Sequence, residues 1–258
     1  MPAMKKIKGI IPPMVTPLLD NGKLDFEGTE RLVNHLIDGG VEAIFILGTT
    51  GEAQSISPQL RKKFTTLVCE KVAGRVPVLV AITDTSMDES LDLARHGAAC
   101  GAAGVVAAAP YYFTLTQDEL AAWFTALADR SPLPLYLYNM PANVKVFLET
   151  GTVRRLASHP NIAGIKDSSA NMTYFQALLY EFGGHDDFAV YMGPEELTGD
   201  AVLMGADGGI NGGANMFPEL YVAMYDAAVK GDIARMRHLQ HYIDRKSTRL
   251  NSSHITIS

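Results

Sequence analysis

The sequence predicts an α/β protein, a single (β/α)8 TIM barrel with a remnant of C-terminal helices. Short apolar segments rich in Val, Ile and Leu alternate with longer amphipathic segments along the chain. The short segments are apolar at nearly every position, which is typical of parallel strands covered by helices on both faces. About eight such strand–helix units fill the chain, as one closed barrel requires. An open dinucleotide-binding sheet is disfavoured because no Gly-x-Gly-x-x-Gly motif follows the first strand.

The individual elements follow from these two patterns in chain order. Apolar segments predict strands at residues 10–16, 43–47, 76–82, 104–109, 133–138, 162–165, 188–192 and 208–210. Amphipathic segments predict helices at residues 26–38, 58–72, 87–100, 117–129, 152–158, 172–181, 195–204 and 217–229. A further helix is expected at residues 233–243, beyond the last strand–helix unit.

The chain is expected to form one domain, because no linker or change in composition precedes residue 245. Residues 1–230 are assigned to the barrel, 231–244 to the start of a C-terminal helical extension, and 245–258 to a tail. The tail is polar and has no helical stripe. We interpret it as non-native sequence, and a natural disordered tail is the alternative.

Composition and charge narrow the class of protein. The net charge of -6 argues against nucleic-acid and anionic membrane partners. No apolar stretch approaches the roughly 20 residues of a membrane span, and residues 1–8 lack the apolar segment of a secretory signal. Cys69 and Cys100 have no metal-type spacing, and the seven histidines are scattered. We therefore expect a cytoplasmic protein with reduced thiols and no metal or other cofactor.

Polar residues gather at the predicted C-terminal strand ends, where barrel enzymes carry their chemistry. These ends are Gly48-Thr49-Thr50-Gly51-Glu52, Pro110-Tyr111-Tyr112, Tyr138-Asn139-Met140-Pro141, Lys166, Gly193-Pro194-Glu195-Glu196 and Asn211-Gly212-Gly213-Ala214-Asn215. Each has a structural explanation when taken alone. A threonine turn can cap a helix, a tyrosine can anchor a strand end, and glutamates favour the positive start of a helix. Their joint occurrence at one rim indicates an active site.

Lys166 is the most informative of these residues, because it directly follows the apolar strand 162–165. A buried ammonium costs several kcal/mol unless it is paired or loses its proton. A neutral amine is a nucleophile for carbonyl carbon, as Schiff-base chemistry requires. The structural alternative is a lysine that pairs with Asp167 or extends its amine to solvent at the strand end.

The motifs that carry these residues, in this order, resemble those of a known family. They are Thr16-Pro17, Gly48-Thr49-Thr50-Gly51-Glu52, Pro110-Tyr111-Tyr112, Tyr138-Asn139-Met140-Pro141 and Gly164-Ile165-Lys166-Asp167. From about residue 9 to about residue 244 the chain resembles the Schiff-base-forming pyruvate aldolases and synthases. This superfamily includes dihydrodipicolinate synthase, N-acetylneuraminate lyase and the 2-keto-3-deoxy sugar-acid aldolases.

The resemblance implies roles for individual residues. Lys166 would form an iminium with the keto carbon of a 2-oxo acid, and Tyr138 would move protons beside it. Thr49 would relay protons to a tyrosine from a neighbouring subunit, a position that Tyr112 matches. The expected assembly is therefore a homodimer or homotetramer. The substrate carboxylate would meet backbone N–H groups and the Thr50 hydroxyl in the turn bounded by Gly48 and Gly51.

The identity of the second substrate depends on further positions. Dihydrodipicolinate synthases carry an arginine shortly after Tyr-Asn-x-Pro, and Asn143 stands there in this chain. Lys145 offers a point charge but no bidentate fork. The pair Glu195 and Glu196 resembles the acidic pair with which sugar-acid lyases bind hydroxyls. Ser168 is expected to add a hydroxyl contact, and Gly193 and Ile210 to shape the pocket.

We therefore favour reversible aldol cleavage of a 2-oxo-3-deoxy sugar acid to pyruvate and an aldehyde. The alternatives within the family are 4-hydroxy-tetrahydrodipicolinate synthase, which joins pyruvate to aspartate semialdehyde, and a keto-acid dehydratase. Two rivals from other classes remain: a phosphate site at the glycine-rich turn 208–213, and a catalytically silent member that acts as a sensor. If the tail is foreign, the last helices of the family are missing, and their apolar partners are expected to be exposed.

Overall fold

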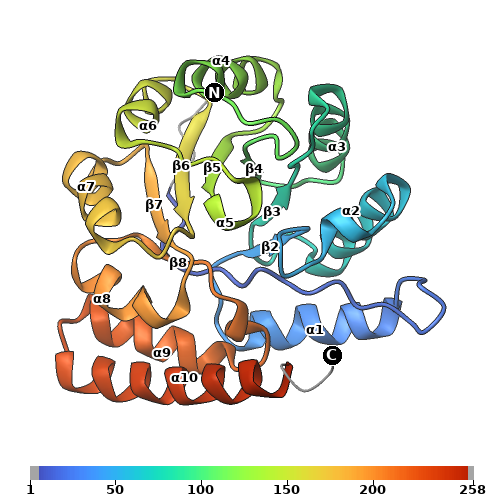
Figure 1. Cartoon of the computed structure of the whole chain (residues 1–258). Coiled ribbons are helices and arrows are strands. Elements are labelled where there is room, and N and C mark those ends of the chain that lie inside the picture. Colours follow the sequence, from blue (N-terminus) through green and yellow to red (C-terminus); the bar gives the residue numbers. More distant parts are fainter. Residues whose placement is uncertain (1–5, 255–258) are drawn as a thin grey trace.

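The structure, a computed structural model, describes residues 6–254 and the side chains of residues 6–245. Eight parallel strands form the predicted barrel (Figure 1). In chain order they are β1 (Gly9–Ile10), β2 (Ile44–Ile46), β3 (Val78–Ala81), β4 (Gly104–Ala108), β5 (Leu135–Asn139), β6 (Ile162–Asp167), β7 (Ala189–Met192) and β8 (Gly208–Gly209). Their order around the sheet is β1-β8-β7-β6-β5-β4-β3-β2, so the first strand pairs with the last. The predicted fold class is confirmed.

The ring closes between β2 and the segment that follows β1. Pro13 forms a parallel bridge with Phe45, whose N–H donates to the Pro12 carbonyl at 3.1 Å. The Phe45 carbonyl accepts from the Met14 N–H at 2.8 Å. The first strand was predicted at residues 10–16, but β1 contains only Gly9 and Ile10. Pro12 and Pro13 have no N–H to donate, which interrupts the ladder there.

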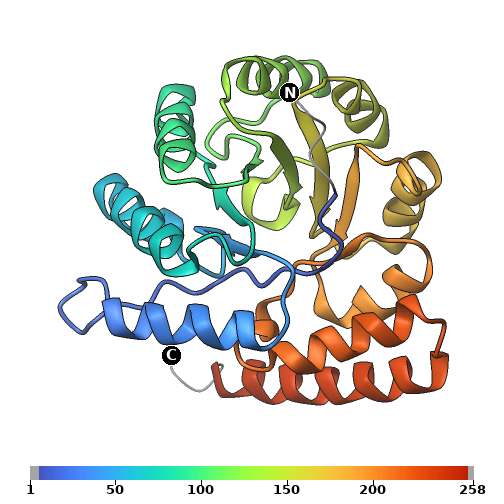
Figure 2. The ribbon, with the colours of Figure 1, turned by 180° about the vertical axis from the view of Figure 1, so that it is seen from behind.

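Helices cover the outside of the barrel, as Figures 1 and 2 show from opposite sides. They are α1 (Phe26–Asp38), α2 (Pro58–Val72), α3 (Met87–Ala99), α4 (Gln117–Arg130), α5 (Pro141–Val144), α6 (Thr150–Ala157), α7 (Met172–Phe182), α8 (Thr198–Leu203), α9 (Pro218–Val229) and α10 (Ile233–His254). Six of them begin at a side chain that accepts a hydrogen bond from the first turn: Asp25, Ser57, Ser86, Thr116, Asn171 and Asp232. Such caps fix where a helix starts. The first two predicted helices have the bounds that were expected.

Three helical segments differ from the prediction. The turn α5 was not expected, because the four residues from Pro141 to Val144 are too few to show a period. The helix predicted at 195–204 is divided into a 3-10 turn at Glu195–Leu197 and α8. Helix α10 continues to His254 instead of ending at residue 243. The foreign origin of the tail stays a prediction, and residues 255–258, like 1–5, lie outside the described part.

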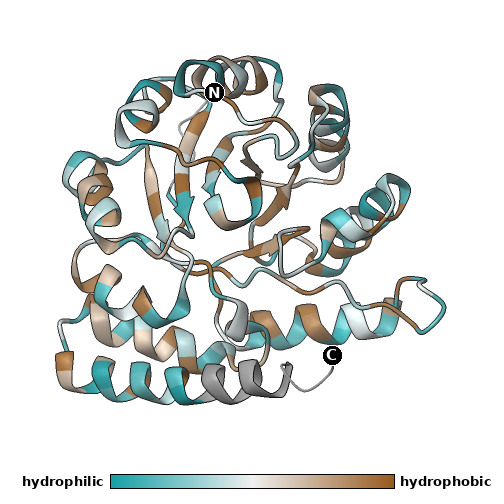
Figure 3. Ribbon diagram, in the orientation of Figure 1, coloured by the Kyte–Doolittle hydropathy of each residue, from teal (hydrophilic) through white to brown (hydrophobic). Residues whose placement is uncertain are grey.

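Two apolar clusters hold the elements together. The larger lies in the barrel and between the strands and helices α1 to α7. The smaller joins α8, α9 and α10, where Met224 on α9 and Met236 and Ile243 on α10 are almost fully buried. Figure 3 shows that the strands are mostly apolar, whereas α10 is largely hydrophilic. Among the described helices, none combines the length and the apolar character needed to cross a bilayer.

The N-terminal end of the barrel is closed by polar groups. The Lys6 amine lies 3.0 Å from the Asp207 carboxylate, and each of these side chains is only 7% exposed. Asp207 also accepts from the Val190 N–H at 2.9 Å. Beside them the buried Tyr191 hydroxyl donates to the Ile7 carbonyl at 2.7 Å. These contacts hold the segment before β1 against the N-terminal end of the barrel.

Candidate active site

Lys166 lies near the C-terminal end of β6, opposite Tyr138 on β5 in the register of the sheet. Lys166 is 5% exposed, and its amine lies 4.2 Å from the Tyr138 ring centroid and 5.2 Å from that of Phe45. Among the described residues no ion pair joins Lys166 to a carboxylate. The neighbouring Asp167 instead accepts hydrogen bonds from Asn139 and Ser169. The alternative in which Asp167 pairs with Lys166 is therefore wrong.

Tyr138 is poised to exchange a proton. Its hydroxyl lies 3.4 Å from the Thr49 hydroxyl, and either group can be the donor. Burial alone would raise the pKa of Tyr138, but the Lys166 charge and hydrogen bonds from Thr49, Ser168 and Lys166 outweigh it. The pKa of Tyr138 therefore lies below the ordinary value of a phenol. A lowered pKa suits a tyrosine that acts as a general base near neutral pH.

The turn after β2 presents Thr49 and Thr50 at the rim, and both residues are exposed. Close packing explains the glycines on either side. A Cβ on Gly48 would lie 2.7 Å from the Phe45 ring, and one on Gly51 would lie 3.0 Å from the Met14 carbonyl. The turn can therefore approach the barrel wall only with glycine at these positions.

A cavity of about 350 Å³ opens beside this turn. It is lined by Leu47, Gly48, Thr49, Glu52, Ala53, Gln54, Ser55, Ala81, Thr83, Ala108, Tyr111, Tyr138, Met140, Asn143 and Val144. Of the predicted site residues, Gly48, Thr49, Tyr138 and Asn143 line this cavity, whereas Lys166, whose amine lies 4.2 Å from the Tyr138 ring centroid, is not among the lining residues. Its polar lining consists mainly of hydroxyl and amide groups, and Glu52 is the one acidic residue among the described lining residues. None of the described lining residues is Lys or Arg.

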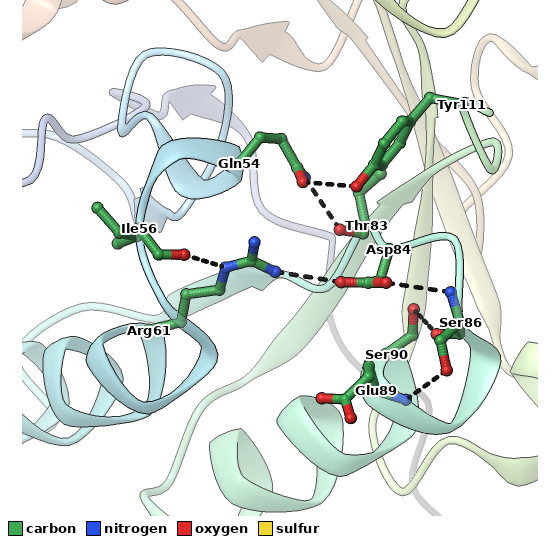
Figure 4. A network of polar contacts seen from close by, with 9 residues as sticks. All are labelled: Gln54, Ile56, Arg61, Thr83, Asp84, Ser86, Glu89, Ser90 and Tyr111. Carbon is green, nitrogen blue, oxygen red and sulfur yellow. Dashed lines mark hydrogen bonds and ion pairs between the residues drawn. The ribbon is translucent and has the colours of Figure 1, made fainter.

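One wall of the cavity was missed by the sequence analysis. Figure 4 shows Gln54 between Tyr111 and Thr83. The Tyr111 hydroxyl donates to the Gln54 side chain at 3.0 Å, and the Gln54 amide donates to the Thr83 carbonyl at 3.0 Å. Behind this wall Arg61 contacts Asp84 at 3.3 Å. Gln54 lies in the 3-10 turn Ala53–Ser55, and Thr83 and Asp84 lie on the loop after β3, so an apolar period gives no signal for them.

Tyr112 is not among the residues that line the cavity, and it is 78% exposed. It meets the Phe113 ring edge to face, with centroids 4.9 Å apart. Phe113 is also exposed, at 74%. The two rings form a projecting aromatic pair, and the structure does not bring Tyr112 to Thr49 within one chain.

A second group of predicted residues lies on the β6, β7 and β8 side of the rim: Ser168, Gly193, Glu195, Glu196 and Ile210. None of these five described residues is among those that line the cavity. Glu196 is exposed. A Cβ on Gly193 would lie 2.0 Å from the Ser168 hydroxyl oxygen, so glycine allows β6 and β7 to approach.

The glycine-rich turn 208–213 is already occupied by protein contacts. The Glu195 carboxylate accepts from the Gly213 N–H at 2.8 Å, and the Ile210 N–H donates to the Met192 carbonyl at 2.8 Å. A carboxylate beside these donors would repel phosphate. This arrangement argues against the phosphate-site rival.

Neither thiol forms a disulfide, since Cys69 and Cys100 are both free. Burial raises the pKa of the Cys69 thiol to about 12, and nearby Cys100 and Glu70 act in the same direction. Cys69 is therefore a half-buried thiol with little thiolate character, which does not suit a nucleophile. Within residues 6–254, no group of three or more His, Cys, Asp and Glu side chains is placed to hold a metal ion.

Fold and site together define a (β/α)8-barrel enzyme whose rim carries a buried lysine beside a hydrogen-bonded tyrosine. The chain belongs to the dihydrodipicolinate synthetase family, whose model matches residues 6–256. It is accordingly a pyruvate-dependent lyase or aldolase.

Proteins named as aldolases and proteins named as synthases are both similar to this chain. The chain is 34% identical over 237 residues to YagE of Escherichia coli K12, provisionally named a 2-dehydro-3-deoxy-D-gluconate aldolase, covering 91% of this chain and 78% of YagE. It is 38% identical over 235 residues to the 4-hydroxy-tetrahydrodipicolinate synthase of Hyphomonas neptunium, covering 90% and 79%. A dihydrodipicolinate synthase structure from Bacteroides thetaiotaomicron is 50% identical with a TM-score of 0.92, covering 95% and 82%. Names of both kinds occur, so the family does not specify the substrate.

Proposed function

We propose that the protein reversibly cleaves a 2-oxo-3-deoxy sugar acid to pyruvate and an aldehyde through a Schiff base on Lys166. The observation that carries this choice is the lining of the cavity beside Tyr138. It offers hydroxyl and amide groups to a ligand and, among its described residues, no cationic side chain. Its volume of about 350 Å³ is sufficient for a small sugar acid.

In the proposed mechanism, the neutral Lys166 amine attacks the keto carbon, and loss of water gives an iminium. Tyr138 accepts the proton of the C4 hydroxyl while the C3–C4 bond breaks. The electron pair of that bond moves to the iminium nitrogen, giving an enamine and the free aldehyde. Protonation at C3 and hydrolysis then release pyruvate and restore the amine. Thr49, 3.4 Å from the Tyr138 hydroxyl, relays the proton.

The 2-oxo acid carboxylate is assigned to the turn after β2. Thr50 offers a hydroxyl, and the turn offers backbone N–H groups that suit an anion. Gly48 and Gly51 support this assignment by allowing the turn to approach the barrel wall. Ser168, Gly193, Glu195, Glu196 and Ile210 remain assigned to the opposite side of the substrate.

The choice between aldehydes rests on charge. Aspartate semialdehyde carries a carboxylate, which is best bound by a bidentate arginine. Asn143 stands where the resemblance places that arginine, and Glu52 adds negative charge to the cavity lining. Hydroxyls of a neutral aldehyde, in contrast, find partners in Gln54, Ser55 and Asn143.

Assembly and location are part of the proposal. The projecting Tyr112, 78% exposed, supports a homodimer or homotetramer in which this ring enters the neighbouring subunit's site. Two free thiols are consistent with a cytoplasmic protein.

The synthase is the second candidate, favoured by the 50% identity to the structure from Bacteroides thetaiotaomicron. Condensation assays with pyruvate distinguish the two candidates, with neutral hydroxyaldehydes of two to four carbons compared with aspartate semialdehyde. We expect a higher kcat/KM for a hydroxyaldehyde. In Asn143→Arg, kcat/KM for aspartate semialdehyde should rise by about tenfold, because a charge-assisted bond adds on the order of 1.5 kcal/mol. A wild-type preference for aspartate semialdehyde overturns the sugar-acid assignment.

Trapping tests the chemistry itself. Borohydride reduction in the presence of pyruvate should leave a covalent adduct on Lys166, located by peptide mass spectrometry. No adduct would indicate a silent member of the family, and an adduct on another lysine would remove Lys166 from the mechanism.

A further inference from the structure

A second pair of residues lies directly beside the reacting pair. Asn139 follows Tyr138 on β5, and Asp167 follows Lys166 on β6, so the two pairs are adjacent in the same register. Successive side chains of a strand point to opposite faces, which places Asn139 and Asp167 outside the barrel lumen. They are 1% and 0% exposed, and the Asn139 amide donates to Asp167 at 2.8 Å.

The Asp167 carboxylate has further partners in the chain that follows it. The Ser169 N–H donates to one oxygen at 3.1 Å, and the Ser169 hydroxyl donates to the other at 3.0 Å. Burial raises the pKa of Asp167, while the bonds from Asn139 and Ser169 act in the opposite direction. A carboxylate held in this way fixes the orientation of the Asn139 amide.

The other end of the Asn139 side chain reaches the segment behind α5. Its oxygen accepts from the Leu148 N–H at 3.1 Å, and the Leu148 carbonyl accepts from the buried Tyr174 hydroxyl at 2.6 Å. The Gln117 side chain, on α4, donates to the Phe147 carbonyl at 2.7 Å. The segment is thus held by side chains from β5, α7 and α4.

Between these points lies α5, which supplies a wall of the cavity through Asn143 and Val144. A helix of four residues has too few internal hydrogen bonds to hold its own position. No side chain caps its start, and it ends at Lys145 with a φ of 60°. Its position therefore depends on how the chain is held at its two ends. Asn139 acts at both: it lies two residues before α5 in the chain, and its side chain accepts from the Leu148 N–H beyond the end of α5.

We propose that Asn139 and Asp167 are positioning residues, which hold the α5 wall of the aldehyde pocket at a fixed place relative to Lys166 and Tyr138. They touch no reacting atom. The inference rests on the proposed use of this cavity for the aldehyde but not on which aldehyde enters it. It predicts that binding of the aldehyde depends on the pair, whereas Schiff-base formation with pyruvate does not.

The experiment separates these two half-reactions in purified full-length variants. Enamine formation is followed by the exchange of pyruvate C3 protons with deuterated solvent in NMR. Aldehyde binding is measured as KM in condensation, with whichever aldehyde the wild type accepts. In Asn139→Ala and Asp167→Ala we expect the aldehyde KM to rise about tenfold, the effect of roughly one lost hydrogen bond. The exchange rate should change less than about threefold.

Three further variants provide controls. Asp167→Asn keeps an acceptor for Asn139 and should retain a normal KM. Asn161, just before β6, donates to the carbonyls of Ala128, Ser131 and Leu133 at the other end of the strand. Asn161→Ala should lower stability without changing the aldehyde KM. If the Ala variants of the pair do not fold, Gln117→Ala is used instead. It removes the hydrogen bond from Gln117 to the Phe147 carbonyl and should also raise the aldehyde KM.

The outcomes are distinct. An unchanged aldehyde KM in the folded variants, or an equal rise in Asn161→Ala, overturns the positioning role. A wild type that accepts aspartate semialdehyde alone overturns the sugar-acid assignment while leaving the pair testable with that aldehyde. A wild type that exchanges pyruvate protons but accepts no aldehyde overturns both.

Discussion

Lys6 and Lys166 are both buried lysines, but they lie at opposite ends of the barrel and in opposite electrostatic situations. The Lys6 amine is 3.0 Å from the Asp207 carboxylate below the strands. Lys166 lies at the upper rim beside the Tyr138 ring, and no ion pair with a carboxylate engages it among the described residues. A paired lysine fastens one part of the chain to another, whereas an unpaired one is available to react. Pairing and position, rather than burial, distinguish the structural lysine from the reactive one.

The strongest test of this comparison is to remove each amine in turn. Lys166→Ala should abolish carbon–carbon bond chemistry while the protein stays folded, because the proposed iminium forms on this amine. Turnover is measured as pyruvate release, and folding by circular dichroism. Lys6→Met is the matched control and should retain turnover per folded molecule. Equal turnover in Lys166→Ala and the wild type would contradict the assignment.

Tyr138→Phe should produce the next largest effect. Loss of the hydroxyl removes the proton-transfer group next to Lys166 and should slow turnover by roughly 10²–10⁴-fold. The Schiff base should still form and remain trappable by borohydride. A loss smaller than about threefold would show that another group carries the proton.

At the lower end of the barrel the effect falls on stability. Lys6→Met leaves the buried Asp207 without its nearest cation and should lower the free energy of unfolding by up to about 3–5 kcal/mol. Lys8, 3.8 Å from Asp207 but 61% exposed, offsets part of this loss. Urea denaturation measures the change. An unchanged midpoint would mean that the pair contributes nothing to the fold.

The pH profile should give the smallest effect. If the basic form of Tyr138 is required, kcat/KM rises with pH until this group is deprotonated. Because the pKa of Tyr138 is lowered, the rise should level off below pH 10. Thr49→Val removes one of the hydrogen bonds that lower the pKa of Tyr138 and should shift the rising part of the pH profile to higher pH. A profile that does not shift would show that Thr49 does not influence the pKa of Tyr138.

Much of the fold was predictable, because strong local patterns coincide with it. Apolar segments located all eight strands. The rule that chemistry lies at strand ends also predicted that Lys166, Tyr138 and Thr49 gather at one end of the barrel, where the structure places them side by side. Their catalytic roles stay a prediction. The pair Lys6 and Asp207 was not predictable, since 201 residues separate its partners. The cavity wall at Gln54 and the turn α5 depend on contacts between loops, which periodicity does not report.

The pairing of the first strand with the last has a consequence for the order of events during synthesis. Gly9 and Ile10 pair with Gly208 and Gly209, so β1 lacks this neighbour until residues 208 and 209 have left the ribosome. The Asp207 partner of Lys6 emerges equally late. The growing chain must therefore carry an open, incomplete sheet until β8 has been synthesised, with a free edge on β1 that only β8 covers.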